Sequence, residues 1–128
     1  MGTGIVDERA ARFSARERRI AELLAGEGHE VRAVPTTAYP TPDAYVDGRP
    51  MEWKTLEPGA TSVTVRNALR RGKKQAEDVF IDARGSGLTR DQAWQGVRRF
   101  VASPYNRLAA IRVVGDFGPD VQWTREER

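Results

Sequence analysis

The sequence predicts an α/β fold in which a mixed central sheet is flanked by helices. Apolar residues recur at helical spacing in three segments, and short apolar runs of the kind found in strands lie between them. Two of these runs surround Asp47-Gly48, a dipeptide that is typical of tight β-hairpins. Helices that alternate with strands in this way pack onto the faces of a sheet.

The first half of the chain is predicted to hold one helix and three strands. Residues 8–26 carry an apolar stripe at helical spacing, and a pair of glycines ends the pattern. A short strand, a proline-rich loop and the two hairpin strands follow. Their predicted ranges are 29–34 for the first strand, 35–42 for the loop, and 43–46 and 50–56 for the hairpin strands.

The second half is predicted to alternate between helices and strands. An amphipathic helix is followed by a wholly apolar run, which is typical of a buried central strand. Thr89 and Gln92 have the spacing of a capping box and mark the beginning of the last helix. The predicted ranges are 62–76 for the first helix, 79–81 for the central strand, 108–114 for the next strand, 121–123 for an edge strand and 124–128 for a polar tail.

Length and composition favour a single domain over residues 1–128. The chain has 128 residues, of which 39% are hydrophobic, so one core is feasible. It contains no apolar stretch of about 18 residues, which argues against a membrane span. The residues after Met1 lack the apolar segment of a signal peptide, so we expect that any export depends on another segment.

The residue types that are missing restrict the chemistry. The sequence has no cysteine, which excludes disulfides, thiolate metal sites and cysteine nucleophiles. His29 is the single histidine, which excludes a zinc site with several histidine ligands. A bound metal must therefore be held by oxygen atoms, which favours Mg²⁺, Mn²⁺ or Ca²⁺.

Two carboxylates and one amine are predicted to converge at one end of the hairpin. Strand side chains alternate between faces, so Glu52 and Lys54 point to one side and Trp53 to the other. The turn brings Asp43 across from this pair. Asp43 and Glu52 can hold a divalent cation that activates water, and Lys54 can orient the water or stabilise the transition state. The pattern indicates metal-dependent phosphodiester hydrolysis.

Glu17 is a further candidate because it lies on the apolar stripe of the first helix, between Phe13 and Ile20. A carboxylate in such a position is costly unless it has a partner. A role at the active site would explain it, and a solvated position at the edge of the stripe is the alternative.

Residues 66–74 are strongly basic. They include five positive side chains and no acid, against a net charge of +3 for the whole chain. Such a segment can neutralise nucleic-acid phosphates, although a solvated helix face is the common alternative. The basic residues are Arg66, Arg70, Arg71, Lys73 and Lys74.

Trp53 and Trp94 are predicted to pack in the core rather than to stack on bases.

Short motifs along the chain resemble those of a known family. Pro42-Asp43 followed by Glu52-Trp53-Lys54 resembles the signature of the PD-(D/E)-x-K nuclease superfamily. The order and spacing of further segments resemble the CdiA-type C-terminal tRNA nuclease toxin domain of contact-dependent growth inhibition systems. These segments are Arg16-Glu17, Ala21 to Leu24, Gly28 to Val31, Pro42 to Ala44, Glu52 to Thr55, Ser62-Val63, Asn67-Ala68, Lys73 to Ala76 and Asp78 to Asp82.

The resemblance implies a restriction-endonuclease-like core that cleaves tRNA with a divalent metal ion, Mg²⁺ or alternatively Mn²⁺. It implies that Glu17, Asp43, Glu52 and Lys54 are catalytic and that Gln75 contacts the substrate or supports the site. It also implies a cognate immunity protein, a larger delivery protein as the parent chain, and action in the cytoplasm of a target bacterium.

Two other functions fit the same residues. One is a DNA endonuclease on the same core, since the superfamily resemblance does not fix the nucleic acid. The other is a non-catalytic nucleic-acid-binding module that uses the helix predicted over residues 62–76. The second alternative explains Glu17 less well than an enzyme does.

Overall fold

The structure is a computed structural model that describes residues 4–39, 41–103 and 105–125. Most of the predicted polar tail, from residue 126 onward, lies outside these ranges, as does Pro40 of the predicted loop. None of the described helices has the length and apolar character needed to cross a membrane.

A mixed sheet of seven strands forms the centre of the described residues. The strands lie side by side in sequence order. Two adjacent pairs in the second half and the first pair are parallel, and the others are antiparallel. The strands are β1 (Ile5–Asp7), β2 (Glu30–Ala33), β3 (Ala44–Val46), β4 (Arg49–Thr55), β5 (Asp78–Asp82), β6 (Ala110–Val114) and β7 (Val121–Thr124).

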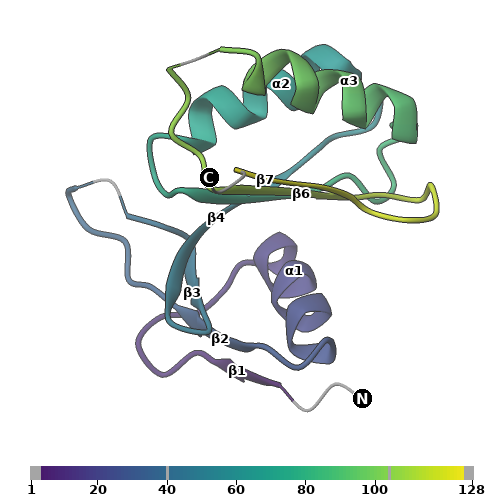
Figure 1. Cartoon of the computed structure of the whole chain (residues 1–128). Coiled ribbons are helices and arrows are strands. Elements are labelled where there is room, and N and C mark those ends of the chain that lie inside the picture. Colours follow the sequence, from purple (N-terminus) through teal and green to yellow (C-terminus); the bar gives the residue numbers. More distant parts are fainter. Residues whose placement is uncertain (1–3, 40, 104, 126–128) are drawn as a thin grey trace.

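Three described helices cover the two faces of the sheet, which confirms the predicted α/β class. They are α1 (Ala15–Gly26), α2 (Ser62–Gly72) and α3 (Arg90–Val101). α2 connects the parallel strands β4 and β5, and α3 connects β5 and β6. Successive connections of the same hand place their helices on one face. Figure 1 shows α2 and α3 together over one face and α1 against the other.

The two faces of the sheet carry separate hydrophobic cores. Every residue of β5 is buried, as predicted for a central strand. Val79 and Ile81 belong to the core under α2 and α3, whereas Phe80 belongs to the core under α1. The two upper helices approach closely at Gly96, where an added Cβ would lie 2.6 Å from the Ser62 carbonyl oxygen. Glycine is therefore required at this helix contact.

The helix predicted over residues 8–26 begins later than expected. Ser14 is the N-cap of α1: its side chain accepts a hydrogen bond from the Glu17 amide, and the Glu17 carboxylate accepts one from the Ser14 amide. This capping box fixes the first turn. Upstream of α1, β1 pairs in parallel with β2. The apolar pattern did not predict β1, because this strand has only three residues.

The helix predicted over residues 62–76 ends early. α2 ends at Gly72, with Lys73 as its C-cap, and the Gln75 amide donates to the Gly72 carbonyl oxygen at 2.9 Å. Lys73, Lys74 and Gln75 therefore lie in the connection to β5 and not on a helix face. The capping box predicted at Thr89 and Gln92 is confirmed at the beginning of α3.

The predicted hairpin around Asp47-Gly48 is confirmed and fixes the register of β3 against β4. Asp47 has φ 51° and Gly48 has φ 83°. Positive values at both turn positions are those of the turn that matches the twist of hairpin strands. In this register Ala44 lies opposite Met51, so the residue before β3, Asp43, lies beside the middle of β4.

Candidate active site

Alternation along β4 places the candidate site residues on one face of the sheet and Trp53 on the other. Trp53 points into the core under α1, where its ring lies 5.1 Å from that of Phe13. Glu52 and Lys54 point to the side of α2. The last residue of α2, Gly72, lies so close that an added Cβ would be 3.6 Å from Cγ of Glu52. The predicted division of β4 into two faces is thus what the structure has.

Asp43 is held against β4 by two hydrogen bonds. Its amide donates to the Met51 carbonyl oxygen at 3.1 Å, and its Oδ2 accepts from the Trp53 amide at 2.8 Å. These bonds fix both the backbone and the carboxylate. Asp43 and Glu52 are therefore brought together, as the sequence predicts.

Glu52 and Lys54 form an ion pair in which one carboxylate oxygen is left over. Lys54 Nζ lies 3.1 Å from Glu52 Oε2, and the Glu52 side chain is only 7% exposed. Glu52 Oε1 is buried and has no hydrogen-bond partner among the described residues. Buried polar atoms nearly always have a partner, so this oxygen makes Glu52 a candidate ligand-binding group.

Both carboxylates have raised pKa values. Burial raises the pKa of Glu52 from 4.5 to about 7, and the charge of Asp43 adds to this effect while Lys54 opposes it. Burial also raises the pKa of Asp43; the Trp53 amide opposes this effect, and the charge of Glu17 increases it. Two carboxylates that resist ionisation side by side are relieved by a cation between them.

Glu17 lies near this pair but is already used by the fold. Its Oε1 accepts from the Ser14 amide at 2.8 Å in the α1 capping box, which answers why a carboxylate is tolerated on the apolar stripe. Glu17 and Asp43 also line one small pocket of about 100 Å³. A catalytic role for Glu17 therefore stays a prediction beside an observed structural one.

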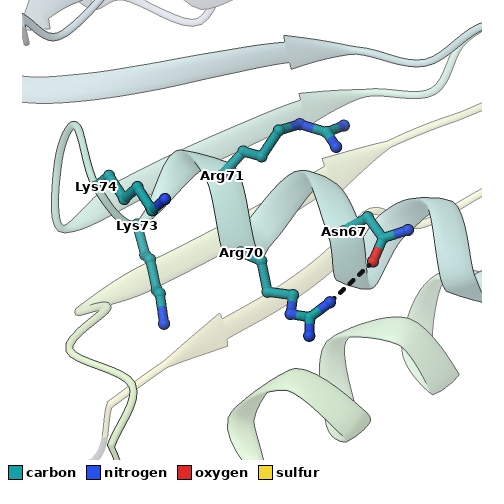
Figure 2. A pocket seen from close by; sticks show the side chains of 5 residues that line it. All are labelled: Asn67, Arg70, Arg71, Lys73 and Lys74. Carbon is teal, nitrogen blue, oxygen red and sulfur yellow. Dashed lines mark hydrogen bonds between the residues drawn. The ribbon is translucent and has the colours of Figure 1, made fainter.

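The basic residues predicted to bind nucleic acid form an open pocket of about 460 Å³ at the end of α2. We call it the basic pocket. Figure 2 shows Arg70 and Lys73 extending to one side of α2 and Arg71 to the other. A 3.5 Å hydrogen bond joins Arg70 to Asn67. The basic pocket is lined by Asn67, Arg70, Arg71, Lys73 and Lys74.

Two predicted nucleic-acid-binding residues lie outside the lining of the basic pocket. Arg66 is half-buried on α2, and its Nε is buried without a hydrogen-bond partner in the described structure. Gln75 is half-buried in the connection to β5, and its Oε1 likewise lacks a partner there. Both have free polar atoms, but neither is brought into the pocket with the four basic side chains.

The oxygen donors suit a hard divalent cation that needs only one or two protein carboxylates. Among the described residues, no group of three or more acidic, histidine or cysteine side chains gathers at one place. Asp43 and Glu52 thus offer two carboxylates, one of which has an unpartnered oxygen. Mg²⁺ commonly takes one or two carboxylates and completes its shell with water and substrate phosphate. The residues present fit such an ion.

Polar residues that the sequence pattern did not single out line the pocket beside Asp43. Thr36 and Thr41 come from the loop between β2 and β3, and Arg12 comes from the segment before α1. The signal was present, because both threonines lie within seven residues of Asp43 in the sequence. Their hydroxyls add hydrogen-bonding groups to the edge of the site.

Comparison with known proteins gives a consistent relationship. The profile of the contact-dependent growth inhibition CdiA C-terminal domain matches residues 40–118. The fold is similar to that of a chain in the CdiA-CT/CdiI toxin and immunity complex from Burkholderia pseudomallei, with a TM-score of 0.66 and 17% identity, over 94% of this chain and 98% of that chain. None of the curated proteins matches the chain in sequence.

Proposed function

The chain belongs to the family of contact-dependent growth inhibition CdiA C-terminal domains, and from this membership and the geometry of β4 we propose that it is a toxin domain that cleaves tRNA. The reaction is metal-dependent hydrolysis of a phosphodiester bond. The catalytic set is Asp43, Glu52 and Lys54, with Glu17 as a fourth member.

The observation that carries the proposal is the arrangement of Asp43, Glu52 and Lys54. The buried carboxylate of Glu52 lies beside the half-buried carboxylate of Asp43, Glu52 has one unpartnered oxygen, and the Lys54 amine lies 3.1 Å from its other oxygen. Burial of a carboxylate oxygen without a hydrogen-bond donor costs stability, so folding alone does not account for Glu52. Perturbed carboxyl groups gathered in this way are typical of active sites.

Asp43 and Glu52 are the residues that would hold the cation, for which Mg²⁺ is the first candidate and Mn²⁺ the second. When bound, such an ion would polarise the scissile phosphate and lower the pKa of a bound water. The hydrogen bond from the Trp53 amide keeps the Asp43 carboxylate oriented toward this position. α2 packs beside Glu52 at Gly72 and would limit access of bulk water to its carboxylate.

Lys54 and the basic pocket would contact the phosphates of the RNA substrate. Lys54 Nζ brings a positive charge to the carboxylates, where negative charge builds on the phosphate in the transition state. The basic pocket lies at the end of the same helix that contacts Glu52 and would neutralise phosphates next to the cleaved bond. Arg66 and Gln75 would support this surface through their unpartnered atoms.

The partners follow from the relationship. The similar fold comes from a toxin and immunity complex, so we propose that a cognate immunity protein blocks the site of this domain. CdiA C-terminal domains are by name the end of a larger protein, which would deliver the domain into the cytoplasm of the target bacterium.

A cleavage assay tests the reaction and its substrate. Wild-type protein is incubated with total tRNA and with plasmid DNA, with Mg²⁺ and with EDTA. We expect tRNA to be cut only with the metal present. Cleavage of plasmid alone would indicate a DNA endonuclease. Salt-sensitive binding without cleavage in any divalent metal would indicate a non-catalytic nucleic-acid-binding module.

Variants of the site test the assignment of residues. Glu52→Gln and Lys54→Ala are each expected to lower the cleavage rate by at least about 100-fold, the effect of removing one transition-state contact. Glu57→Gln is the matched control, because Glu57 is exposed and pairs with Arg16 on the surface. Wild-type cleavage by a folded Lys54→Ala protein would overturn the assignment.

A further inference from the structure

Arg32 is an exposed cation that is held in place without using its hydrogen-bond donors. Its guanidinium carbon lies 4.8 Å from the centre of the half-buried Tyr45 ring, which is a cation–π contact. Within the described residues Arg32 makes no ion pair or side-chain hydrogen bond, whereas Arg9 and Arg49 each bind a carboxylate. Its N–H donors are therefore available to a ligand, in a position that the ring fixes.

Arg32 and Tyr45 lie on the same face of the sheet as Glu52. Arg32 is the register partner of Tyr45, and Tyr45 is the register partner of Pro50. Register partners point to one face, and so do residues two apart on a strand, so the row shares its face with Glu52. Val31, which precedes Arg32, belongs to the core under α1 on the other face. Tyr45 and Glu52 are diagonal neighbours across β3 and β4, about 7–8 Å apart.

This face of β2 is open to solvent. Glu30 and Arg32 are exposed, whereas Val31 and Ala33 are buried under α1. Such alternation is typical of a sheet with one packed and one solvated face. Figure 1 shows α2 and α3 above β6 and β7, while β1, β2 and β3 lie away from them, beside α1. An uncovered surface therefore adjoins the candidate site.

The charges around Arg32 leave it available to an anion. Asp7 is its register partner on β1, but both Asp7 oxygens are bonded by the Arg9 side chain, at 3.0 and 2.7 Å. These bonds lower the pKa of Asp7 to about 2, and the charge of Arg32 contributes. Glu30 lies on the side of Arg32 toward the hairpin turn, where its amide bonds the turn. Arg9 and Arg32 also line one open pocket of about 420 Å³.

The basic pocket reaches toward this surface from α2. Lys73 Nζ lies 6.0 Å from the centre of the Phe100 ring, so Lys73 is on the α3 side of α2. Figure 2 shows Arg71 extending to the opposite side, away from α3 and toward the first half of the sheet. The end of α2 lies over β4 and β5 at Gly72. In strand order the basic pocket is followed by Glu52 on β4, Tyr45 on β3 and Arg32 on β2.

We propose that Arg32 binds a phosphate of the RNA substrate next to the cleaved bond, and that Tyr45 positions the Arg32 side chain. The inference rests on the proposed nuclease function and deepens it, because it extends the RNA-binding surface across β4 to β3 and β2. The planar guanidinium matches two phosphate oxygens. A side chain that is already oriented by a ring loses little freedom when it binds. The substrate strand runs from the basic pocket over Glu52 to Arg32.

The first experiment measures binding without cleavage. A labelled tRNA is titrated with protein in EDTA, at salt concentrations from about 50 to 200 mM. Arg32→Gln is expected to weaken binding by about 10-fold at low salt, as for one charged hydrogen-bonding contact. It should also make the slope of log affinity against log salt shallower by about 0.7–0.9, the change for one lost phosphate contact.

Arg98→Gln is the matched control. Arg98 is also exposed and also lies over an aromatic ring, at 5.6 Å from the centre of Trp94, but it belongs to α3. We expect its affinity and salt slope to stay near the wild-type values. An unchanged slope in Arg32→Gln, or equal changes in the two variants, would overturn the phosphate contact.

The second experiment tests the positioning role of Tyr45. Tyr45→Leu is expected to raise KM for tRNA cleavage by about 2- to 5-fold with kcat little changed, the effect of one exposed cation–π contact. Tyr45→Phe keeps the ring and should keep KM near wild type. In the Arg32→Gln protein, Tyr45→Leu should have no further effect on KM, because the contact is already lost. Additive effects would overturn the positioning role.

The outcomes separate the two proposals. Cleavage by the wild-type protein without any effect of Arg32→Gln on tRNA binding would overturn the inference and leave the nuclease function standing. An altered salt slope in Arg32→Gln, in a wild-type protein that cuts no RNA with Mg²⁺ or Mn²⁺, would overturn the nuclease function and leave the phosphate contact. Absence of tRNA binding by the wild-type protein would overturn both.

Discussion

Glu52 and Asp82 are two buried carboxylates on neighbouring parallel strands, yet their surroundings differ completely. Asp82 is 1% exposed, and both of its oxygens are bonded by Arg84, through Nε at 2.8 Å, Nη2 at 2.9 Å and the backbone amide at 3.1 Å. Glu52 is 6% exposed, has Lys54 as an ion partner at one oxygen, and has no partner at the other.

The pKa values of the two groups move in opposite directions for this reason. Burial alone would raise the pKa of Asp82, but the hydrogen bonds from Arg84 hold it below its usual 3.8. Burial raises the pKa of Glu52 to about 7, with the charge of Asp43 adding to it. Both oxygens of Asp82 are bonded by Arg84, whereas Glu52 has one oxygen paired with Lys54 and one buried oxygen without a donor among the described residues. Burial alone does not distinguish the two carboxylates, but burial without a full set of hydrogen-bond partners makes Glu52 the candidate functional residue.

Removing the partner of Asp82 is expected to have the largest effect on stability. Arg84→Met keeps an apolar stem and removes all side-chain donors, so Asp82 is left as a buried charge without a side-chain partner. We expect a loss of about 3–5 kcal/mol in the free energy of unfolding, measured by urea denaturation at pH 7.

The matched change at the other carboxylate is Lys54→Met. Glu52 already takes up a proton near neutral pH, so it can become neutral when Lys54 is removed. At pH 6 the expected loss is about 1 kcal/mol. Equal losses in the two variants would show that the two carboxylates are not different in kind.

The pH dependence of stability gives the next largest effect. The folded protein holds a proton on Glu52 that the unfolded chain releases near pH 4.5, because the folded pKa is about 7. This contribution to stability is fully present below pH 4.5 and is lost as the pH rises through 7, about 3 kcal/mol in all. Glu52→Gln removes the dependence and should therefore gain about 3 kcal/mol relative to wild type between pH 4.5 and pH 8.

Asp82 predicts the opposite sign, because its pKa is lowered. Its contribution is present above about pH 3.8 and is lost as the pH falls through its folded pKa. Urea denaturation of both wild type and Glu52→Gln from pH 4.5 to pH 8 measures the first effect, with Glu57→Gln as the control at an exposed position. Mg²⁺ at pH 8 should also stabilise the wild type and not Glu52→Gln. The same pH dependence of stability in the two proteins would contradict the raised pKa of Glu52.

The elements that the sequence predicted well are those with a strong local signal. The hairpin at Asp47-Gly48 requires positive φ at two successive residues, and few sequences provide it. The capping box at Thr89 and the wholly apolar run of β5 were equally direct. β1 was missed because three residues carry no periodicity, and its pairing with β2 depends on contacts distant in sequence.

The site was predicted in its residue types but not in its physical state. Strand alternation was sufficient to place Glu52 and Lys54 together, and the turn was sufficient to add Asp43. That Glu52 has a buried oxygen without a partner depends on how α2 packs against β4, which no local pattern encodes.

A third carboxylate, Glu17, lies between the two cases and gives the smallest stability effect. Its carboxylate accepts from the Ser14 amide like a structural group and also lines the pocket with Asp43 like a functional one. Ser14→Ala removes the cap and is expected to cost about 1 kcal/mol in urea denaturation without lowering the cleavage rate. Glu17→Gln retains a side chain that can complete the capping box, so its stability should be close to wild type. If Glu17 acts with Asp43, this stable variant loses cleavage; if cleavage is retained, Glu17 belongs with Asp82 as a residue of the fold, and the catalytic set reduces to Asp43, Glu52 and Lys54.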